Sequence, residues 1–179
     1  MKFLHLADLH LGKRVNGFDF LEDQRFILEQ VLDICDKNKV EAVVLAGDIS
    51  WGMSLEQSLP DFQFIDALPG KKILLKGNHD YWWNTAAKMQ RFFDEHGLDS
   101  LQILHNNCVF YGDMALCGTR GWFYELEEPG GHTEKMRSRE AGRLETSLKA
   151  AGEREKLCFL HYPPLYTGYR CEEMLRLLQ

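Results

Sequence analysis

The sequence lacks long apolar runs and an excess of basic residues. No stretch of the 179 residues reaches the roughly 18 consecutive apolar residues that a membrane-spanning helix needs, so a membrane protein is not expected. Lysine and arginine number 21 against 27 aspartate and glutamate, which gives a net charge of -6. This balance argues against a broad nucleic-acid surface, although a local one remains open.

Paired cysteines and targeting segments are also missing. The five cysteines are scattered with no C-x-x-C pair, which indicates reduced thiols in a cytoplasmic protein. No signal peptide is visible, because Met1-Lys2 leads directly into a short strand-like run. Repeats, low-complexity tracts and linkers are absent, so residues 1–179 are expected to form a single domain.

What the sequence does contain is an alternation of apolar strands and amphipathic helices. Helices are expected near 20–37, between 54 and 69, and at 85–96, 133–151 and 171–178; strands are expected at 2–7, 42–46, 72–75 and 157–160, with two or three more in 101–118. Pro60 fits only the first turn of the second helix. The βαβαβ opening predicts an α/β fold with a mostly parallel sheet.

Four of the expected strands end in polar side chains that can bind metals or move protons. These side chains are Asp8 and His10, Asp48, the run Asn78-His79-Asp80, and His161. The carboxyl ends of parallel strands share one edge of a sheet, where ligands bind. Each motif alone also fits an ordinary turn or a core histidine, but their order and position together favour a metal site.

The residue types suit a pair of divalent metal ions that clamp a phosphoryl displacement. Asp48 is expected to bridge the two ions because a carboxylate has two oxygens. Asp8 and His10 would serve one ion, and Asn78 and His161 the other. A hydroxide activated by both metals would attack phosphorus. His79 would protonate the leaving group as a catalytic residue, and Asp80 would hydrogen-bond His79 and orient it.

In order and residue type, these motifs resemble the calcineurin-like metallophosphoesterase superfamily over nearly the whole chain. The resemblance implies a sandwich of mixed β-sheets flanked by helices. It also implies a dinuclear site loaded with manganese, iron or zinc. The same ligand roles follow for Asp8, His10, Asp48, Asn78 and His161, with His79 as proton donor.

Two finer resemblances differ along the chain. Residues 1–48 are similar to the SbcD-type DNA-repair exonuclease subunit, and the remainder is similar to small bacterial metallophosphoesterases. The second covers more residues, including Tyr81-Trp82-Trp83, Gly118-Thr119-Arg120-Gly121-Trp122 and His161-Tyr162-Pro163-Pro164. The chain is therefore expected to be a mosaic with its seam near Asp48.

One feature of the superfamily is missing. Its site ends with a Gly-His-x-His motif on a further strand, but this sequence reaches Gln179 without one. We therefore expect a domain that lacks its C-terminal strands, with water or a partner chain in place of two imidazole ligands. The missing strand would leave an exposed sheet edge, which invites formation of a homo-oligomer.

Substrate-binding candidates lie near the predicted site. Trp82 could stack a base or pack a leaving group, and Arg120 could pair with phosphate oxygens. Alternatively, the tryptophans seal the loops as a small core. The expected function is a metal-dependent phosphoesterase acting on a phosphomonoester or phosphodiester. An SbcD-like nuclease, for which nucleic acid is the substrate, and a catalytically impaired metal-binding or interaction module are the alternatives.

Overall fold

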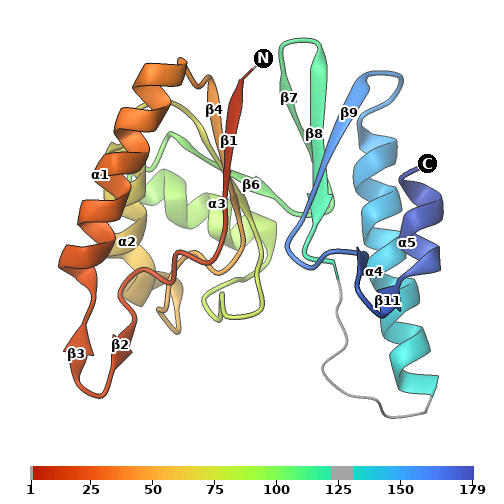
Figure 1. The fold of residues 1–179 in the computed structure, drawn as a ribbon, viewed down its shortest axis with the longest axis horizontal. Helices are drawn as coiled ribbons and strands as arrows, with labels where there is room; N and C mark the ends of the chain where they lie inside the picture. The colour runs from red at the N-terminus through yellow and green to blue at the C-terminus, as the bar shows by residue number, and fades with distance from the viewer. Residues whose placement is uncertain (1, 122–130) are drawn as a thin grey trace. The chain divides into compact units, whose positions relative to one another are not determined.

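The structure is a computed structural model that describes residues 2–121 and 131–179 (Figure 1). It divides into two compact units, Met1–Ile103 and Leu104–Gln179, and each is described by itself. Among the described residues, no helix is both long and apolar enough to cross a membrane. The expectation of one domain over the whole chain stays a prediction.

A four-stranded sheet forms the centre of the first unit. Its order is β1 (Phe3–Leu6), β4 (Ala42–Ala46), β5 (Lys72–Leu75) and β6 (Leu101–Leu104). The strands β1, β4 and β5 run parallel, with Leu6 opposite Leu45 and Ala46 opposite Leu75. The predicted parallel α/β arrangement is confirmed, and it aligns the carboxyl ends of these three strands.

Three helices connect these strands and share one core (Figure 1). They are α1 (Leu21–Asn38), α2 (Leu55–Ala67) and α3 (Ala86–Glu95). Right-handed connections between consecutive neighbouring strands place their helices on the same face of a sheet. Fully buried Phe62 of α2 and Phe93 of α3 accordingly pack together, with ring centroids 5.4 Å apart.

The position of Pro60 contradicts the sequence-based prediction. Helix α2 begins at Leu55, so Pro60 lies inside the helix rather than in its first turn. The hydroxyl of Ser54 caps the helix by accepting the backbone N–H of Gln57 at 3.3 Å. Proline removes only the hydrogen bond to the carbonyl of Glu56, and Glu56 is exposed to water. Burial of Phe62 and Ile65 therefore outweighs that loss.

A hairpin lies between Asp8 and α1, in a segment for which the sequence predicted neither a helix nor a strand. Strands β2 (Arg14–Val15) and β3 (Phe18–Asp19) pair antiparallel around Asn16 and Gly17. Both turn residues have positive φ, 50° and 84°. Asn-Gly is the dipeptide that such a two-residue hairpin turn favours, so the signal was present in the sequence.

The second unit holds a mixed three-stranded sheet. Strand β8 (Met114–Thr119) pairs antiparallel with β7 (Cys108–Tyr111) and parallel with β9 (Glu155–Leu160). Helix α4 (Gly131–Ala150) packs on β8, and α5 (Glu172–Leu177) packs on α4. A short hairpin of β10 (Leu165–Tyr166) and β11 (Tyr169–Arg170) precedes α5. The mixed sheet and its flanking helices agree with the predicted fold class.

Candidate metal centre

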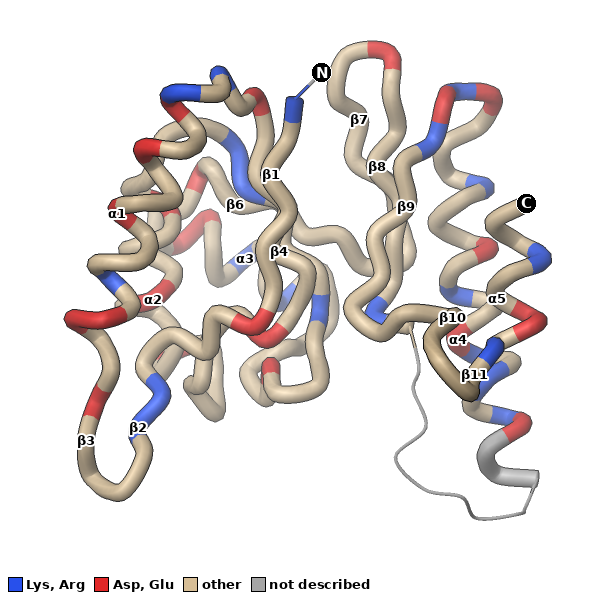
Figure 2. Tube along the Cα trace, viewed as in Figure 1, with Lys and Arg blue, Asp and Glu red and all other residues tan. Residues whose placement is uncertain are grey.

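The segments that follow β1 and β4 run side by side in the first unit. The backbone N–H of Asp8 donates to the backbone carbonyl of Gly47 at 3.1 Å, and that of His10 donates to the backbone carbonyl of Asp48 at 2.8 Å. Acidic residues accordingly follow the ends of both strands (Figure 2). Adjacent parallel strands thus bring Asp8 and His10 next to Asp48, as the sequence predicted.

Three of the expected ligands have an unusual backbone conformation. Asp8, His10 and Asp48 have φ values of 59°, 45° and 54°, in the left-handed region that few residues other than glycine adopt. Such conformations cost free energy and cluster where a protein fixes functional side chains. Here they turn both strand ends sharply at the residues that carry the ligand atoms.

The side chains of His10, Asp48 and His79 converge. Each offers one ligand atom, and these atoms lie within 4.8 Å of one another. Asp48 Oδ2 lies 2.7 Å from His79 Nδ1 and 3.7 Å from His10 Nε2. Asp8 Oδ1 lies 3.9 Å from His10 Nε2. The first unit therefore gathers two imidazoles and two carboxylates at one sheet edge.

Burial and charge prepare these groups for a cation. Asp48 is 2% exposed, whereas the side chain of Asp8 is 62% exposed. Burial lowers the pKa of His10, and the Asp48 carboxylate opposes that shift only in part. His10 is therefore held neutral, which is the form that binds metals.

An orphaned atom offers a direct test of whether a metal ion fits. His10 Nδ1 is buried and has no hydrogen-bond partner among the described residues. Buried polar atoms almost always have a partner, so an exception needs an explanation. Imidazole and carboxylate together suit divalent transition metals. The residues of this centre thus fit a divalent cation.

His79 is held by Asp48 through two contacts. Its backbone N–H donates to Asp48 Oδ1 at 2.8 Å, while its ring Nδ1 faces Asp48 Oδ2. The side-chain nitrogen of Asn78 lies 2.9 Å from the same ring nitrogen. The His79 side chain is 37% exposed, so the imidazole is anchored on one side and open to solvent on the other.

Trp51 contacts two residues of this cluster, and its position three residues after Asp48 was the only signal for it in the sequence. Its ring stacks on His79 at 5.4 Å and meets His10 edge-on at 5.3 Å. The ammonium of Lys13 lies 4.5 Å from the centre of the indole ring. Trp51 therefore packs against both histidines of the candidate site.

The expected hydrogen bond from Asp80 to His79 is not present between these described residues. Asp80 is 1% exposed, and its carboxylate accepts five hydrogen bonds, from the backbone N–H groups of Asp48, Ile49, Ser50 and Gly77 and from the indole of Trp82. All five partners are donors, so they hold the ionised carboxylate even though burial raises the pKa of Asp80. Asp80 orients the loops and does not orient His79.

Trp82 is also placed differently from its predicted role. It is 2% exposed, its ring lies 4.8 Å from that of Phe62, and its N–H donates to Asp80 at 3.0 Å. A side chain enclosed in this way cannot stack on a substrate. The alternative that the tryptophans seal a small core is therefore correct for Trp82.

Gly77 allows the loops after β4 and β5 to approach closely. A methyl group at Gly77 would lie 2.1 Å from Asp48 Oδ1 and 2.2 Å from the Asp48 backbone nitrogen. No side chain can be accommodated at such distances. Position 77 therefore requires glycine because Asp48 lies so close, and not because its backbone has a left-handed conformation.

The remaining predicted residues lie in the second unit. His161 follows β9, and its ring lies 4.9 Å from that of Tyr162. The backbone N–H of Tyr162 donates to the backbone carbonyl of Arg120 at 2.9 Å. Hence His161 and Arg120 lie near each other at the ends of β9 and β8. The guanidinium of Arg120 is 3.9 Å from the buried carboxylate of Glu140, which also pairs with Arg143.

Residues 1–177 match the calcineurin-like phosphoesterase family, Metallophos. The chain belongs to this family. The family comprises hydrolases of phosphate esters that typically bind divalent metal ions, which agrees with the convergence of His10, Asp48 and His79.

Solved structures resemble this member of the calcineurin-like phosphoesterase family at low sequence identity. The protein TT1561 of Thermus thermophilus has a TM-score of 0.62 at 16% identity, covering 98% of this chain and 75% of that chain. A second crystal structure has a TM-score of 0.54 at 13% identity, covering 92% and 70%. Both likenesses support the fold alone. AQ665 of Aquifex aeolicus, a protein of unknown function, matches at 15% identity over 88% and 89% with a TM-score of 0.38, too low to bear on the fold.

Proposed function

We propose that the protein hydrolyses a phosphomonoester or phosphodiester at a centre built on Asp48. The observation that supports this most directly is the convergence of His10, Asp48 and His79 within 4.8 Å at the carboxyl ends of parallel strands. Membership of the calcineurin-like phosphoesterase family gives the reaction class. The substrate itself is part of the proposal.

The proposed ligand set follows the order of the family motifs. Asp8 and His10 bind one divalent ion, Asn78 and His161 bind the other, and Asp48 serves both. Manganese, iron and zinc all accept this mixture of imidazole and carboxylate. When bound, such ions lower the pKa of water and offset the charge of the phosphoryl group.

His79 is the proposed proton donor to the leaving group. Its Nδ1 faces Asp48 Oδ2 at 2.7 Å, so the carboxylate fixes the orientation of the ring. The second ring nitrogen is then left to donate a proton to the departing alkoxide. The same geometry also suits His79 as a metal ligand. If His79 is a metal ligand, its substitution should remove metal affinity. If it is the proton donor, its substitution should remove turnover and leave metal affinity unchanged.

Groups beside the centre are proposed to receive the substrate. Lys13 is a cation next to the two histidines, where it can pair with a phosphate oxygen. Arg120 remains a proposed phosphate-binding residue, with its charge shared with Glu140. The net charge of -6 gives no support to the nuclease alternative.

The deciding experiment is hydrolysis of a chromogenic phosphodiester by metal-stripped protein, with and without added manganese. We expect turnover only with metal, and we expect Asp48→Asn to abolish it. Asp33→Asn, an exposed aspartate of α1, is the matched control and should retain turnover. If folded protein supplied with manganese, iron or zinc hydrolyses neither phosphomonoesters nor phosphodiesters, the proposed enzymatic activity is wrong. Preference for DNA over a small diester would favour the nuclease.

A further inference from the structure

An apolar groove leads away from the candidate metal centre. A cavity of about 540 Å³ lies between α1 and the segment that follows β1, and Asp8 and His10 form part of its wall. Its floor is made by Leu6, Leu9 and Leu28, and exposed Phe20 and Ile27 stand at its lip. The volume is typical of pockets that bind small ligands.

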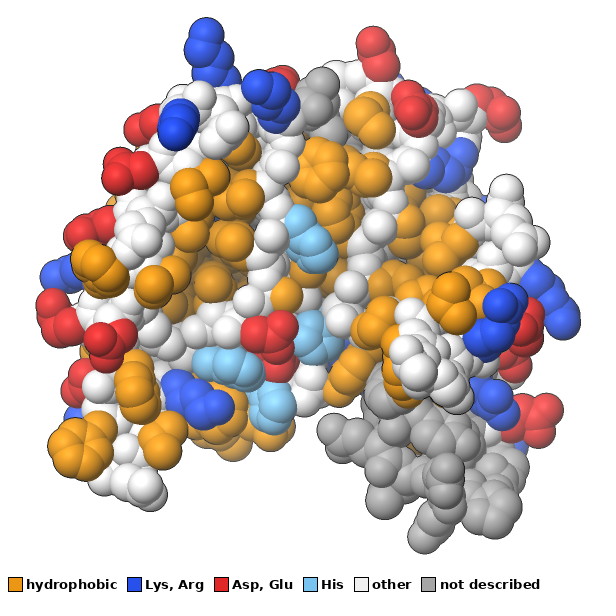
Figure 3. Space-filling model, in the orientation of Figure 1, with side chains coloured by type: hydrophobic (Ala, Val, Ile, Leu, Met, Phe, Trp, Pro, Cys, Tyr) orange, Lys and Arg blue, Asp and Glu red, His pale blue; other side chains and the backbone are white. Residues whose placement is uncertain are grey.

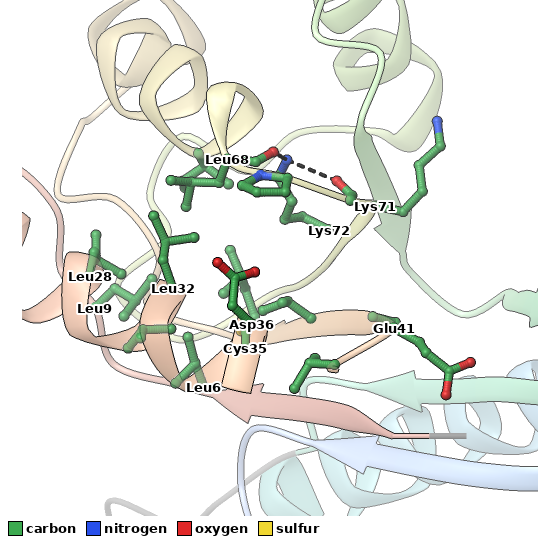
Figure 4. Close-up of a pocket in the computed structure, with 18 residues that line it drawn as sticks. Leu6, Leu9, Leu28, Leu32, Cys35, Asp36, Glu41, Leu68, Lys71 and Lys72 are labelled. Carbon is green, nitrogen blue, oxygen red and sulfur yellow. Dashed lines mark hydrogen bonds between the residues drawn. The ribbon is translucent and has the colours of Figure 1, made fainter. Parts of the chain in front are cut away.

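A second cavity continues the groove along α1. It measures about 240 Å³ and shares Leu6, Leu9, Leu28 and Val31 with the first cavity. Leu32 and Cys35 extend its wall, Asp36 lies beside Cys35, and Glu41 lies farther from Leu9 and Leu28 (Figure 4). Figure 3 shows a hollow lined by hydrophobic side chains beside α1. From Gln24 to Cys35 the helix rises about 16 Å, so the combined groove is elongated.

Specific contacts hold the groove open. The side-chain nitrogen of Gln24 donates to the carbonyls of Leu9 and His10 at 2.9 Å each, and its oxygen accepts the N–H of Gly12 at 3.2 Å. Leu28, one turn further on, is the one buried residue of α1. The helix is thus tied to the loop that carries His10, and beyond Leu28 it does not close onto the sheet.

The polar groups of the groove lie mainly at its two ends. Asp8, His10 and Lys13 mark the end at the metal centre. At the other end, the Lys72 ammonium donates to the carbonyls of Asp66 and Gly70 at 3.1 Å and 2.9 Å, so that its charge is satisfied by the backbone. Between these groups the wall is largely aliphatic, although the carboxylates of Asp23, Asp36 and Glu41 also line the two cavities. The side-chain amide of Gln24 is already bonded to backbone groups of the loop after β1.

We infer that the groove holds the hydrocarbon chain of the substrate, which is then a phosphate ester of a single-chain amphiphile. This inference rests on the proposed function, because it places the phosphate beside Asp8 and His10. Continuity between the apolar wall and these two residues is the reason to assign the groove to the substrate rather than to a second protein chain. Burial of methylene groups would supply binding free energy.

A chain-length series tests the inference. Alkyl 4-nitrophenyl phosphodiesters with methyl, butyl, octyl and dodecyl chains are compared below their critical micelle concentrations. We expect kcat/KM to rise with chain length, by up to about fourfold for each methylene that becomes fully buried. A value that does not change from methyl to dodecyl would overturn the inference while leaving the proposed function intact.

Two matched variants locate the chain. Ile27 is 55% exposed and lines the groove, whereas Ile34 is 48% exposed on the same helix and lines neither cavity. Ile27→Glu should lower the dodecyl-to-methyl ratio of kcat/KM at least tenfold, and Ile34→Glu should leave that ratio unchanged. Equal effects of the two variants would contradict the assignment. Val31→Trp, which fills the groove, should act like Ile27→Glu.

A binding measurement separates the groove from catalysis. Titration calorimetry with dodecylphosphonate and methylphosphonate requires no turnover, and we expect the long chain to bind at least a hundredfold more tightly. If the long chain binds but no ester is hydrolysed, the proposed function fails and the groove assignment stands. If sedimentation instead shows a dimer that Ile27→Glu dissociates and no chain binds, a second copy occupies the groove and the inference is wrong.

Discussion

Asp80 Oδ2 accepts the backbone N–H of Asp48 at 2.9 Å. The same oxygen accepts the N–H of Gly77 at 2.7 Å, so one buried carboxylate joins the loop after β4 to the loop after β5. Those loops carry Asp48 and the Asn78-His79 pair. The spacing of the candidate ligands therefore depends on a residue whose side chain contacts none of their ligand atoms.

Asp80→Asn tests this connection. The amide replaces one acceptor oxygen with a donor that faces N–H groups, so we expect a loss of about 3 kcal/mol in the free energy of unfolding. Metal affinity should fall as well, because Asp48 and His79 are no longer held together. Urea unfolding and calorimetric manganese titration measure the two effects. Unchanged values in both would show that the five hydrogen bonds do not position the site.

Gly77→Ala tests the close approach of the loops. The added methyl group would meet Asp48 at 2.1 Å, so the loops must separate, at a cost on the order of 1–3 kcal/mol. Manganese affinity is expected to fall in parallel. Gly142→Ala is the control, since that helical glycine faces open space and alanine there should stabilise the protein by about 0.5–1 kcal/mol. A Gly77→Ala protein with native metal affinity would contradict the prediction.

Substitution of the two histidines separates ligand from proton donor. We expect His10→Ala to weaken manganese binding, because it removes the imidazole whose Nε2 lies 3.7 Å from Asp48 Oδ2. His79→Ala should retain manganese and lower kcat by roughly 10²–10⁴, the usual contribution of a positioned acid. Calorimetry and steady-state kinetics on the same preparations distinguish these results. Loss of manganese from His79→Ala would identify that residue as a ligand instead.

Asp61 is predicted to make stability depend on pH. Burial raises the pKa of this carboxyl above its ordinary value of 3.8, although the Ser50 hydroxyl, which donates to it at 2.6 Å, opposes the shift. At pH values between the ordinary pKa, which applies to the unfolded state, and the raised pKa of the native state, the native state binds more protons than the unfolded state. The stabilising contribution is therefore present below pH 3.8 and is lost as pH rises through the raised pKa.

Asp61→Asn should remove this dependence. The free energy of unfolding of the variant, measured relative to the original protein, is expected to increase from about pH 3.5 to about pH 7. The amide oxygen can still accept the Ser50 hydroxyl, which keeps the packing similar. Urea titrations at a series of pH values give the comparison. A constant difference between the two proteins across this range would rule out a raised pKa.

Much of the fold could be predicted because its signals are local. Apolar runs of four or five residues predicted the strands, and polar residues two or three positions after Leu6, Ala46 and Leu75 predicted the candidate ligands. Parallel pairing then required those strand ends to meet. The Asn16-Gly17 hairpin was equally local and was missed only because the segment around it has little apolar alternation.

The environment of individual side chains could not be predicted in the same way. Asp80 and Trp82 follow His79 closely, and the sequence gives them the same polar and aromatic character as residues of an active site. Their burial depends on backbone groups about 30 residues away and on Phe62 of α2. Pro60 similarly lies inside a helix because tertiary burial of Phe62 and Ile65 outweighs one lost hydrogen bond.

The sequence by itself determined the parallel strand framework, the family motifs and the residue types available for metal binding. These follow from periodicity and from the order of residues along the chain. Only the tertiary structure decided which polar side chains face one another, that Asp80 supports the loops, and that α1 leaves an apolar groove beside Asp8 and His10. Those features arise from packing between distant segments, which no local pattern encodes.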